Sequence, residues 1–127
     1  DDVVLDVYDF LKIQIADLVA LGIPHGQIIA DPGIGFGKSL SHNVELINRL
    51  SVFHGLGVPV MLGASRKGFI RAIGQPEDAN DRMPGSLAVG LAALAQGVQI
   101  LRVHDVAATR QAVNLWQAVV YGEHIGT

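Results

Sequence analysis

Charged and hydrogen-bonding side chains follow three apolar segments of this 127-residue chain. Asp31 ends the first segment, Ser65-Arg66-Lys67 follows the second, and Arg102 and His104 end the third. An arginine supplies a planar fork that matches phosphate oxygens, and an imidazole can donate a further hydrogen bond. Because Arg102 and His104 are two residues apart on a predicted strand, their side chains point to the same side. This spacing predicts an anion site, and the alternative is a structural ion pair of Arg102 with Asp31 or Asp105.

The first of these segments opens into a loop with alternating glycines, Asp31-Pro-Gly-Ile-Gly-Phe-Gly-Lys-Ser39. Such glycines let a backbone approach a ligand closely. A P-loop would need glycine where Pro32 stands, and a dinucleotide fingerprint would need it where Lys38 stands. We therefore expect a ligand other than ATP or NAD, with Asp31 binding the N–H edge of a flat heterocycle beside Phe36. The alternatives are a hydrogen bond of Asp31 within its own turn and packing of Phe36 within the loop.

Basic side chains at the second segment follow a turn of small residues that starts at Gly63. Arg66 and Lys67 then stand at the start of a predicted helix, where the helix dipole disfavours cations. This placement favours an anionic or electron-rich partner near Ser65, Arg66 and Lys67. The alternative is a basic turn in contact with solvent.

The segments that position these residues alternate between helix and strand. Helical spacing of apolar residues and the turn residues between them predict helices over 3–21, about 43–54, 68–73, from Pro84 or Ser86 to 95, and after Asp105, and strands over 27–30, 58–62 and 99–103. We expect Ser41 to cap the second helix, with Val44, Ile47 and Leu50 as its buried stripe, and Asp105 to cap the last, with Val106, Val113, Trp116 and Val120 as its stripe. Strands that alternate with helices pair in parallel, so the three polar groups should meet at one edge of a sheet.

Two α/β architectures fit this order, a doubly wound open sheet and the C-terminal part of a (β/α)₈ TIM barrel. Both place ligands at the carboxyl ends of the strands. A full barrel needs about 250 residues, so the barrel interpretation makes residues 1–127 a single partial domain of about three strands with flanking helices. The net charge of −3 gives no footprint for nucleic acid, and no apolar run suits a membrane span. The absence of cysteine fits a cytoplasmic protein.

Four segments in order resemble the C-terminal half of the dihydropteroate synthase family of pterin-binding enzymes. They are Asp31–Lys38, Leu62–Lys67, Gly85–Ala88 and Leu101–Asp105. The resemblance implies a (β/α)₈ barrel and a transferase of folate biosynthesis. That enzyme joins 6-hydroxymethyl-7,8-dihydropterin diphosphate to p-aminobenzoate and releases pyrophosphate.

The resemblance also implies a role for each matching residue. The catalytic residues would be Lys67, Arg102 and His104, and the substrate-binding residues would be Asp31, Phe36, Gly63, Ser65, Arg66, Lys67, Arg102 and His104. Asp31 and Lys67 would contact the pterin, and Arg102 would stack on it while reaching the diphosphate together with His104. Ser65, Arg66 and Phe36 would lie near the aminobenzoate. Gly68 stands where many relatives carry serine, which would remove one polar contact to that substrate.

The family further implies Mg²⁺, a homodimer formed through C-terminal helices, and sensitivity to sulfonamides. Its metal ligand is expected in the N-terminal half, with no metal site in the present segment, so we expect this chain alone to be inactive. Two alternatives stay open. One is the methyltetrahydrofolate-binding domain of a corrinoid methyltransferase, and the other is a non-catalytic association fragment.

Overall fold

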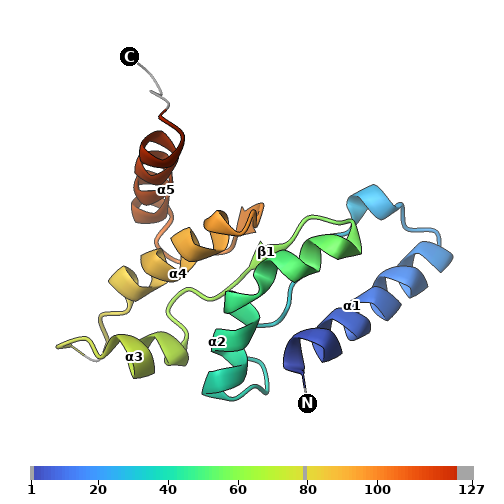
Figure 1. Cartoon of the computed structure of the whole chain (residues 1–127), viewed down its shortest axis with the longest axis horizontal. Coiled ribbons are helices and arrows are strands. Elements are labelled where there is room, and N and C mark those ends of the chain that lie inside the picture. The colour runs from blue at the N-terminus through green and yellow to red at the C-terminus, as the bar shows by residue number, and fades with distance from the viewer. Residues whose placement is uncertain (1, 79, 123–127) are drawn as a thin grey trace.

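The computed structural model describes residues 2–78 and 80–122. Figure 1 shows short strands at the centre, with α1 on one side and α5 projecting from the other. The elements, in chain order, are α1 (Val3–Ala20), η1 (His25–Gln27), α2 (Leu40–Asn48), η2 (Leu50–Leu56), β1 (Met61–Leu62), α3 (Gly68–Gly74), α4 (Met83–Ala95), β2 (Ile100–Leu101) and α5 (Val106–Tyr121). This order confirms the predicted alternation of helices with strand segments.

The strand segments pair in parallel, as predicted, but they are much shorter than expected. β1 pairs with β2, with Met61 opposite Ile100, and the first predicted strand is reduced to a single bridge between Ala30 and Val60. Pro59 has no N–H and so cannot donate a hydrogen bond to a neighbouring strand. The N–H of Val60 donates to the side chain of Gln99 at 2.8 Å instead of to a strand backbone. The regular ladder between the second and third segments therefore starts only at Met61.

The second helix starts earlier than predicted and has a different cap. The hydroxyl of Ser39, not that of Ser41, accepts the N–H of His42. At Arg49 the chain changes from the α-helix to the 3₁₀-helix η2. Ile47 and Leu50 are buried as predicted, whereas Val44, predicted to be buried, is 42% exposed and Leu46 is buried instead.

One main hydrophobic cluster holds the strand segments against the helices. Its fully buried side chains come from α1, the glycine loop, α2, η2 and the residue before β1, and they are Val4, Ile34, Leu46, Leu50, Phe53 and Val60. Ile34 is the apolar residue between two of the loop glycines. The glycine loop is therefore anchored in the core by Ile34, while Gly35 next to it is exposed.

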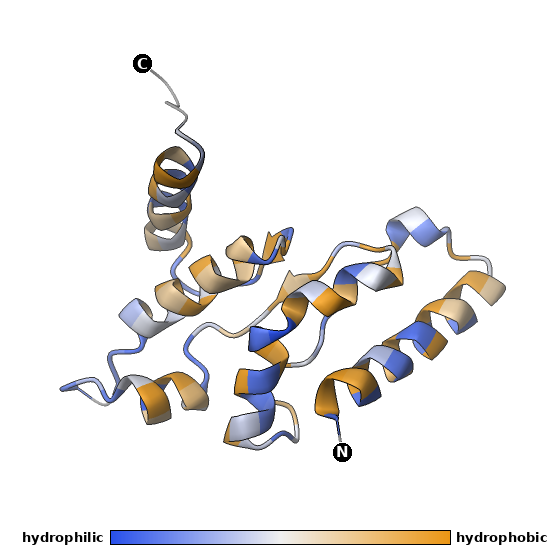
Figure 2. Ribbon diagram, in the orientation of Figure 1, coloured by the Kyte–Doolittle hydropathy of each residue, from blue (hydrophilic) through white to orange (hydrophobic). Residues whose placement is uncertain are grey.

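The last two helices lie side by side at one end of the molecule (Figure 1). α3 and α4 match their predicted ranges closely. Asp105 stands at the N-cap position of α5, but its side chain makes no capping hydrogen bond there. The predicted stripe of α5 is also only partly covered, because Val106 and Val120 are exposed. Figure 2 shows apolar residues on several turns of α5.

Among the described residues, no helix is long and apolar enough to cross a bilayer.

Candidate active site

The glycine loop is closed by its own polar side chains. Asp31 accepts the N–H of Gly33 through Oδ1 at 2.8 Å, so the hydrogen bond within its own turn is present. Lys38 donates through Nζ to the carbonyl oxygens of Gly33 at 2.7 Å and Phe36 at 3.1 Å. Gly33, Gly35 and Gly37 all have positive φ angles, of 74°, 88° and 63°. Glycine is thus required at each turn of the loop, because other residues adopt this conformation at a cost.

Asn43 was not predicted as a site residue, yet it fixes the middle of the glycine loop. Its Oδ1 accepts the N–H of Gly35 at 2.8 Å, and its side chain belongs to the buried part of α2. With 5% of its surface exposed, Asn43 is the buried polar residue of the described chain. No local pattern signals this role, because an asparagine near a helix start is typical of an exposed position.

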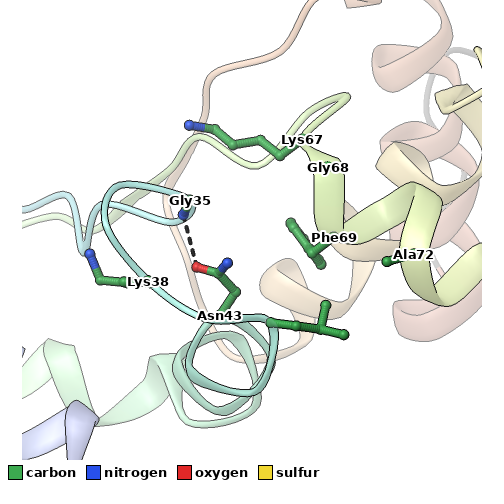
Figure 3. Close-up of a pocket in the computed structure, with 8 residues that line it drawn as sticks. Gly35, Lys38, Asn43, Lys67, Gly68, Phe69 and Ala72 are labelled. Carbon is green, nitrogen blue, oxygen red and sulfur yellow. Dashed lines mark hydrogen bonds between the residues drawn. The ribbon is translucent and has the colours of Figure 1, made fainter.

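Lys67 brings the second strand end into contact with the glycine loop. Its Nζ lies 4.2 Å from the centroid of the Phe36 ring, a cation–π arrangement. A Cβ atom at Gly35 would stand 2.9 Å from Cδ of Lys67, so glycine is needed here for the lysine to pass. Figure 3 shows Lys67 reaching from the start of α3 toward the loop. Phe36 itself is exposed, and its ring is in contact with the lysine rather than packed inside the loop.

Arg66 points toward the third strand end and is held there by an acidic partner. Its guanidinium donates from Nε and Nη2 to the two carboxylate oxygens of Asp105. The hydrogen bond from Arg66 lowers the pKa of Asp105 below its ordinary value, and the same contact raises the pKa of Arg66. Asp105 is one of the two partners that a structural ion pair of Arg102 would predict. The structure corrects this, because Asp105 binds Arg66.

Arg102 and His104 are both exposed at the third strand end. The guanidinium of Arg102 lies over Gly63, where any Cβ atom would overlap it. His104 donates its backbone N–H to Oγ of Ser65 at 3.3 Å, and its Nδ1 lies 3.2 Å from the same oxygen. Arg102 forms no ion pair within the described part of the chain, so the structural ion pair considered above is not observed.

The second strand end therefore contacts both the first and the third. Lys67 joins the second end to the glycine loop, and Ser65 joins it to His104 of the third. A cleft of about 390 Å³ opens between the glycine loop and α3, lined by Gly35, Lys38, Leu40, Asn43, Lys67, Gly68, Phe69 and Ala72 (Figure 3). Asp31, Arg102 and His104 are not among the residues that line it. The site thus has two parts, a cleft bordered by Lys67 and an open rim with Arg102 and His104.

A metal ion in a protein is often held by a cluster of ligand side chains. Residues 2–78 and 80–122 hold no group of three His, Cys, Asp or Glu side chains placed to bind one. Asp31 accepts from Gly33 through one oxygen, and both oxygens of Asp105 accept from Arg66. We therefore assign no chemical step on this chain to a metal.

The fold and the site define a partial α/β barrel with a ligand site at its strand ends, and comparison with known proteins identifies its family. A family model described as "Pterin binding enzyme" matches residues 1–104. The chain belongs to this family. It is 43% identical over 121 residues to a dihydropteroate synthase of Neisseria meningitidis serogroup B. The match covers 93% of this chain and 42% of that relative. The chain thus spans less than half the length of this curated relative.

Solved structures give the same result for the fold. A Xanthomonas albilineans dihydropteroate synthase with 4-aminobenzoic acid superimposes with a TM-score of 0.90 at 45% identity, over 94% of this chain and 44% of that one. The same enzyme in complex with 7,8-dihydropteroate also gives a TM-score of 0.90 at 45% identity, over 94% of this chain and 46% of that one. These matches confirm the predicted fold class and the resemblance to dihydropteroate synthases. They also exclude the doubly wound open sheet as the architecture of this chain.

Proposed function

We propose that this chain forms part of a dihydropteroate synthase, which joins 6-hydroxymethyl-7,8-dihydropterin diphosphate to p-aminobenzoate. The observation that carries the proposal is the rim, where Arg102 and His104 lie beside the Ser65–Lys67 turn in a member of the pterin-binding family. In the reaction, the bond between the exocyclic methylene carbon and the diphosphate oxygen breaks. A bond from that carbon to the amine nitrogen forms, and the nitrogen loses a proton.

Each strand end supplies one part of this chemistry. Asp31 keeps Oδ2 for the N–H edge of the pterin, while Oδ1 accepts from Gly33. Arg102 and His104 neutralise the leaving diphosphate, and the guanidinium plane of Arg102 can also stack on the pterin ring. Lys67 lies between this rim and the cleft. The protein then acts by orienting the partners and stabilising the charge that develops on the leaving group.

The cleft beside Lys67 suits the second substrate. Its apolar walls include Phe69 and Ala72, which fits an aromatic ring. Phe36 stands at its border, and Gly68 offers no side-chain donor there. A Xanthomonas albilineans relative was solved with 4-aminobenzoic acid, which supports this class of ligand.

The complete reaction needs more than this chain. The family expectation places the Mg²⁺ ligand elsewhere in the enzyme, and we propose that the chain alone does not turn over. We also propose a homodimer, supported by an apolar groove of about 350 Å³ between α4 and α5. A cytoplasmic location and sensitivity to sulfonamides remain predictions, and both rest on the family.

A chimera tests the proposed function directly. The matching part of the Neisseria meningitidis relative, about 42% of its length, is replaced by this chain. We expect pyrophosphate release that requires both substrates, and a loss of about 100-fold for Asp31→Asn or Arg102→Gln. Arg110→Gln, on the exposed side of α5, is the matched control and should retain the rate.

Two results would contradict the proposal. One is a folded chimera without turnover. The other is a chain that binds methyltetrahydrofolate tightly but neither pyrophosphate nor a dihydropterin, which would favour the corrinoid methyltransferase alternative.

A further inference from the structure

Arg66 has a backbone conformation that its residue type does not favour. Its φ angle is 57°, in the left-handed region, and among the described non-glycine residues only Gln75 shares this property. A Cβ atom makes this region costly, and such strain persists only where the surrounding structure holds it. Contacts from outside the turn must therefore hold Arg66 in this conformation.

Three side chains hold Arg66, and none of them was predicted to belong to the site in this way. Ser86 of α4 accepts the N–H of Arg66 through Oγ at 2.8 Å. Arg82, just before α4, donates to the carbonyl oxygen of Arg66 at 3.0 Å and also accepts from Ser86 through its own carbonyl oxygen. Asp105 binds the guanidinium on both oxygens. Both the backbone and the side chain of Arg66 are thus fixed from outside its own loop.

The two neighbours of Arg66 are the residues that connect the site. Ser65 contacts His104, and Lys67 reaches over Phe36 to the glycine loop. With Arg66 in the left-handed conformation, Ser65 contacts the third strand end and Lys67 contacts the glycine loop. A change at Arg66 would therefore move both contacts at once.

We propose that the Arg66–Asp105 pair, supported by Arg82 and Ser86, is a positioning tether that joins the second strand end to the third and does not bind substrate. This proposal rests on the proposed function for its consequence, namely that the tether sets Lys67 and His104 in place for the two substrates. It revises the prediction that Arg66 contacts the aminobenzoate. The fork of Arg66 is already filled by a carboxylate whose side chain is only 20% exposed. Arg66 could reach a ligand only by leaving that carboxylate without its partner.

Hydrogen exchange of backbone amides tests the tether without reference to any activity. In the full chain, Arg66→Asn removes the guanidinium but tolerates the left-handed backbone, and Asp105→Asn removes the charge. Each variant should speed exchange at the amide of His104 about two- to fivefold, as expected for a half-exposed ion pair. The double variant should add little more, because both changes break one interaction. The amide of Ala30, which donates to the carbonyl oxygen of Pro59 in the core, should keep its rate and so separate a local from a global effect.

A titration with inorganic pyrophosphate then tests the consequence for the rim. We expect Arg66→Asn, Asp105→Asn and the double variant to weaken binding by similar factors, and Arg110→Gln to leave it unchanged. If Asp105→Asn keeps or tightens binding while Arg66→Asn weakens it, Arg66 contacts the ligand itself and the proposal is wrong. Equal acceleration at Ala30 and His104, or none at His104, also overturns it. If the unmodified chain fails to bind pyrophosphate, the proposed function fails, whereas the exchange result still decides the tether.

Discussion

At the scale of single residues, the site depends on glycines whose missing side chains leave room for basic ones. Gly63 lets the guanidinium of Arg102 lie over the end of β1, and Gly35 lets Lys67 pass over the loop. These glycines are therefore part of the site, although they supply no functional group.

Substitution of Gly63 should displace Arg102 without removing it. In Gly63→Ala, the new methyl group overlaps the guanidinium, so we expect pyrophosphate affinity to fall about tenfold, close to the loss of one charged hydrogen bond. Isothermal titration measures this. The matched control is Gly26→Ala in η1, where a Cβ atom meets nothing within 4 Å. Equal affinities for the two variants would show that Arg102 does not bind the anion.

Asn43 provides a second prediction at this scale. Asn43→Ala removes the acceptor of the Gly35 N–H in a buried position, so we expect a loss of about 1–3 kcal/mol in the free energy of unfolding. Urea denaturation measures the loss. Asn48→Ala, at an exposed position of the same helix, should stay within about 0.5 kcal/mol. A similar value for both variants would mean that Asn43 does not anchor the loop.

At the scale of secondary structure elements, α3 and α4 approach closely because Gly85 has no side chain. A Cβ atom at Gly85 would overlap Cγ2 of Ile70. We expect Gly85→Ala to destabilise the fold by about 1–3 kcal/mol, the usual cost of overpacking. Ile70→Leu moves the branch away from Cβ and should recover part of this loss in the double variant, which thermal unfolding can measure. Purely additive effects would contradict direct contact between these two residues.

The start of α1 should make stability depend on pH. Asp2 caps the helix and binds Arg49, and the backbone hydrogen bond from Leu5, followed by that from Arg49, lowers its pKa from 3.8. A lowered pKa means that the folded state favours the charged form. The stabilisation is therefore complete above 3.8 and is lost as the pH falls through the folded pKa. Asp105 contributes with the same sign.

A comparison of two variants measures the effect of Asp2. Asp2→Asn keeps a capping side chain but removes the charge, so its unfolding midpoint should change less than that of the parent as the pH falls below about 3.8. Asp9→Asn, at an exposed position of α1, serves as the control and should follow the parent. If Asp2→Asn follows the parent as closely as Asp9→Asn does, Asp2 has no role in acid unfolding.

At the scale of the whole molecule, the apolar groove between α4 and α5 should be covered by a second copy of the chain. Leu91, Leu115, Trp116 and Val119 are among its lining residues, and Val119 is 80% exposed. We expect sedimentation to show a dimer that Val119→Lys dissociates. Leu21→Lys, at a residue that is 81% exposed beyond α1, should leave the dimer intact. A parent chain that stays monomeric at every concentration tested would contradict the proposed homodimer.

The sequence by itself determined the alternation of helices with strands, the three polar strand ends and the resemblance to pterin-binding enzymes. These features are local, because the hydrophobic period, the turn residues and each short motif lie within a few residues of one another. The presence of Asp31, Lys67, Arg102 and His104 at strand ends therefore followed without coordinates. The parallel order of the strands followed from the alternation.

Only the tertiary structure decided which of these residues contact one another. The pairing of Arg66 with Asp105 joins positions 39 residues apart, and the hydrogen bond from Gly35 to Asn43 depends on how α2 packs beneath the loop. The short strands and the cap at Ser39 likewise depend on how Gln99, Pro59 and the start of α2 compete for backbone groups. Contacts of this kind are set by strand register and helix packing, which no local pattern encodes. The strand ends could thus be found from the sequence, whereas the tether that holds two of them together could not.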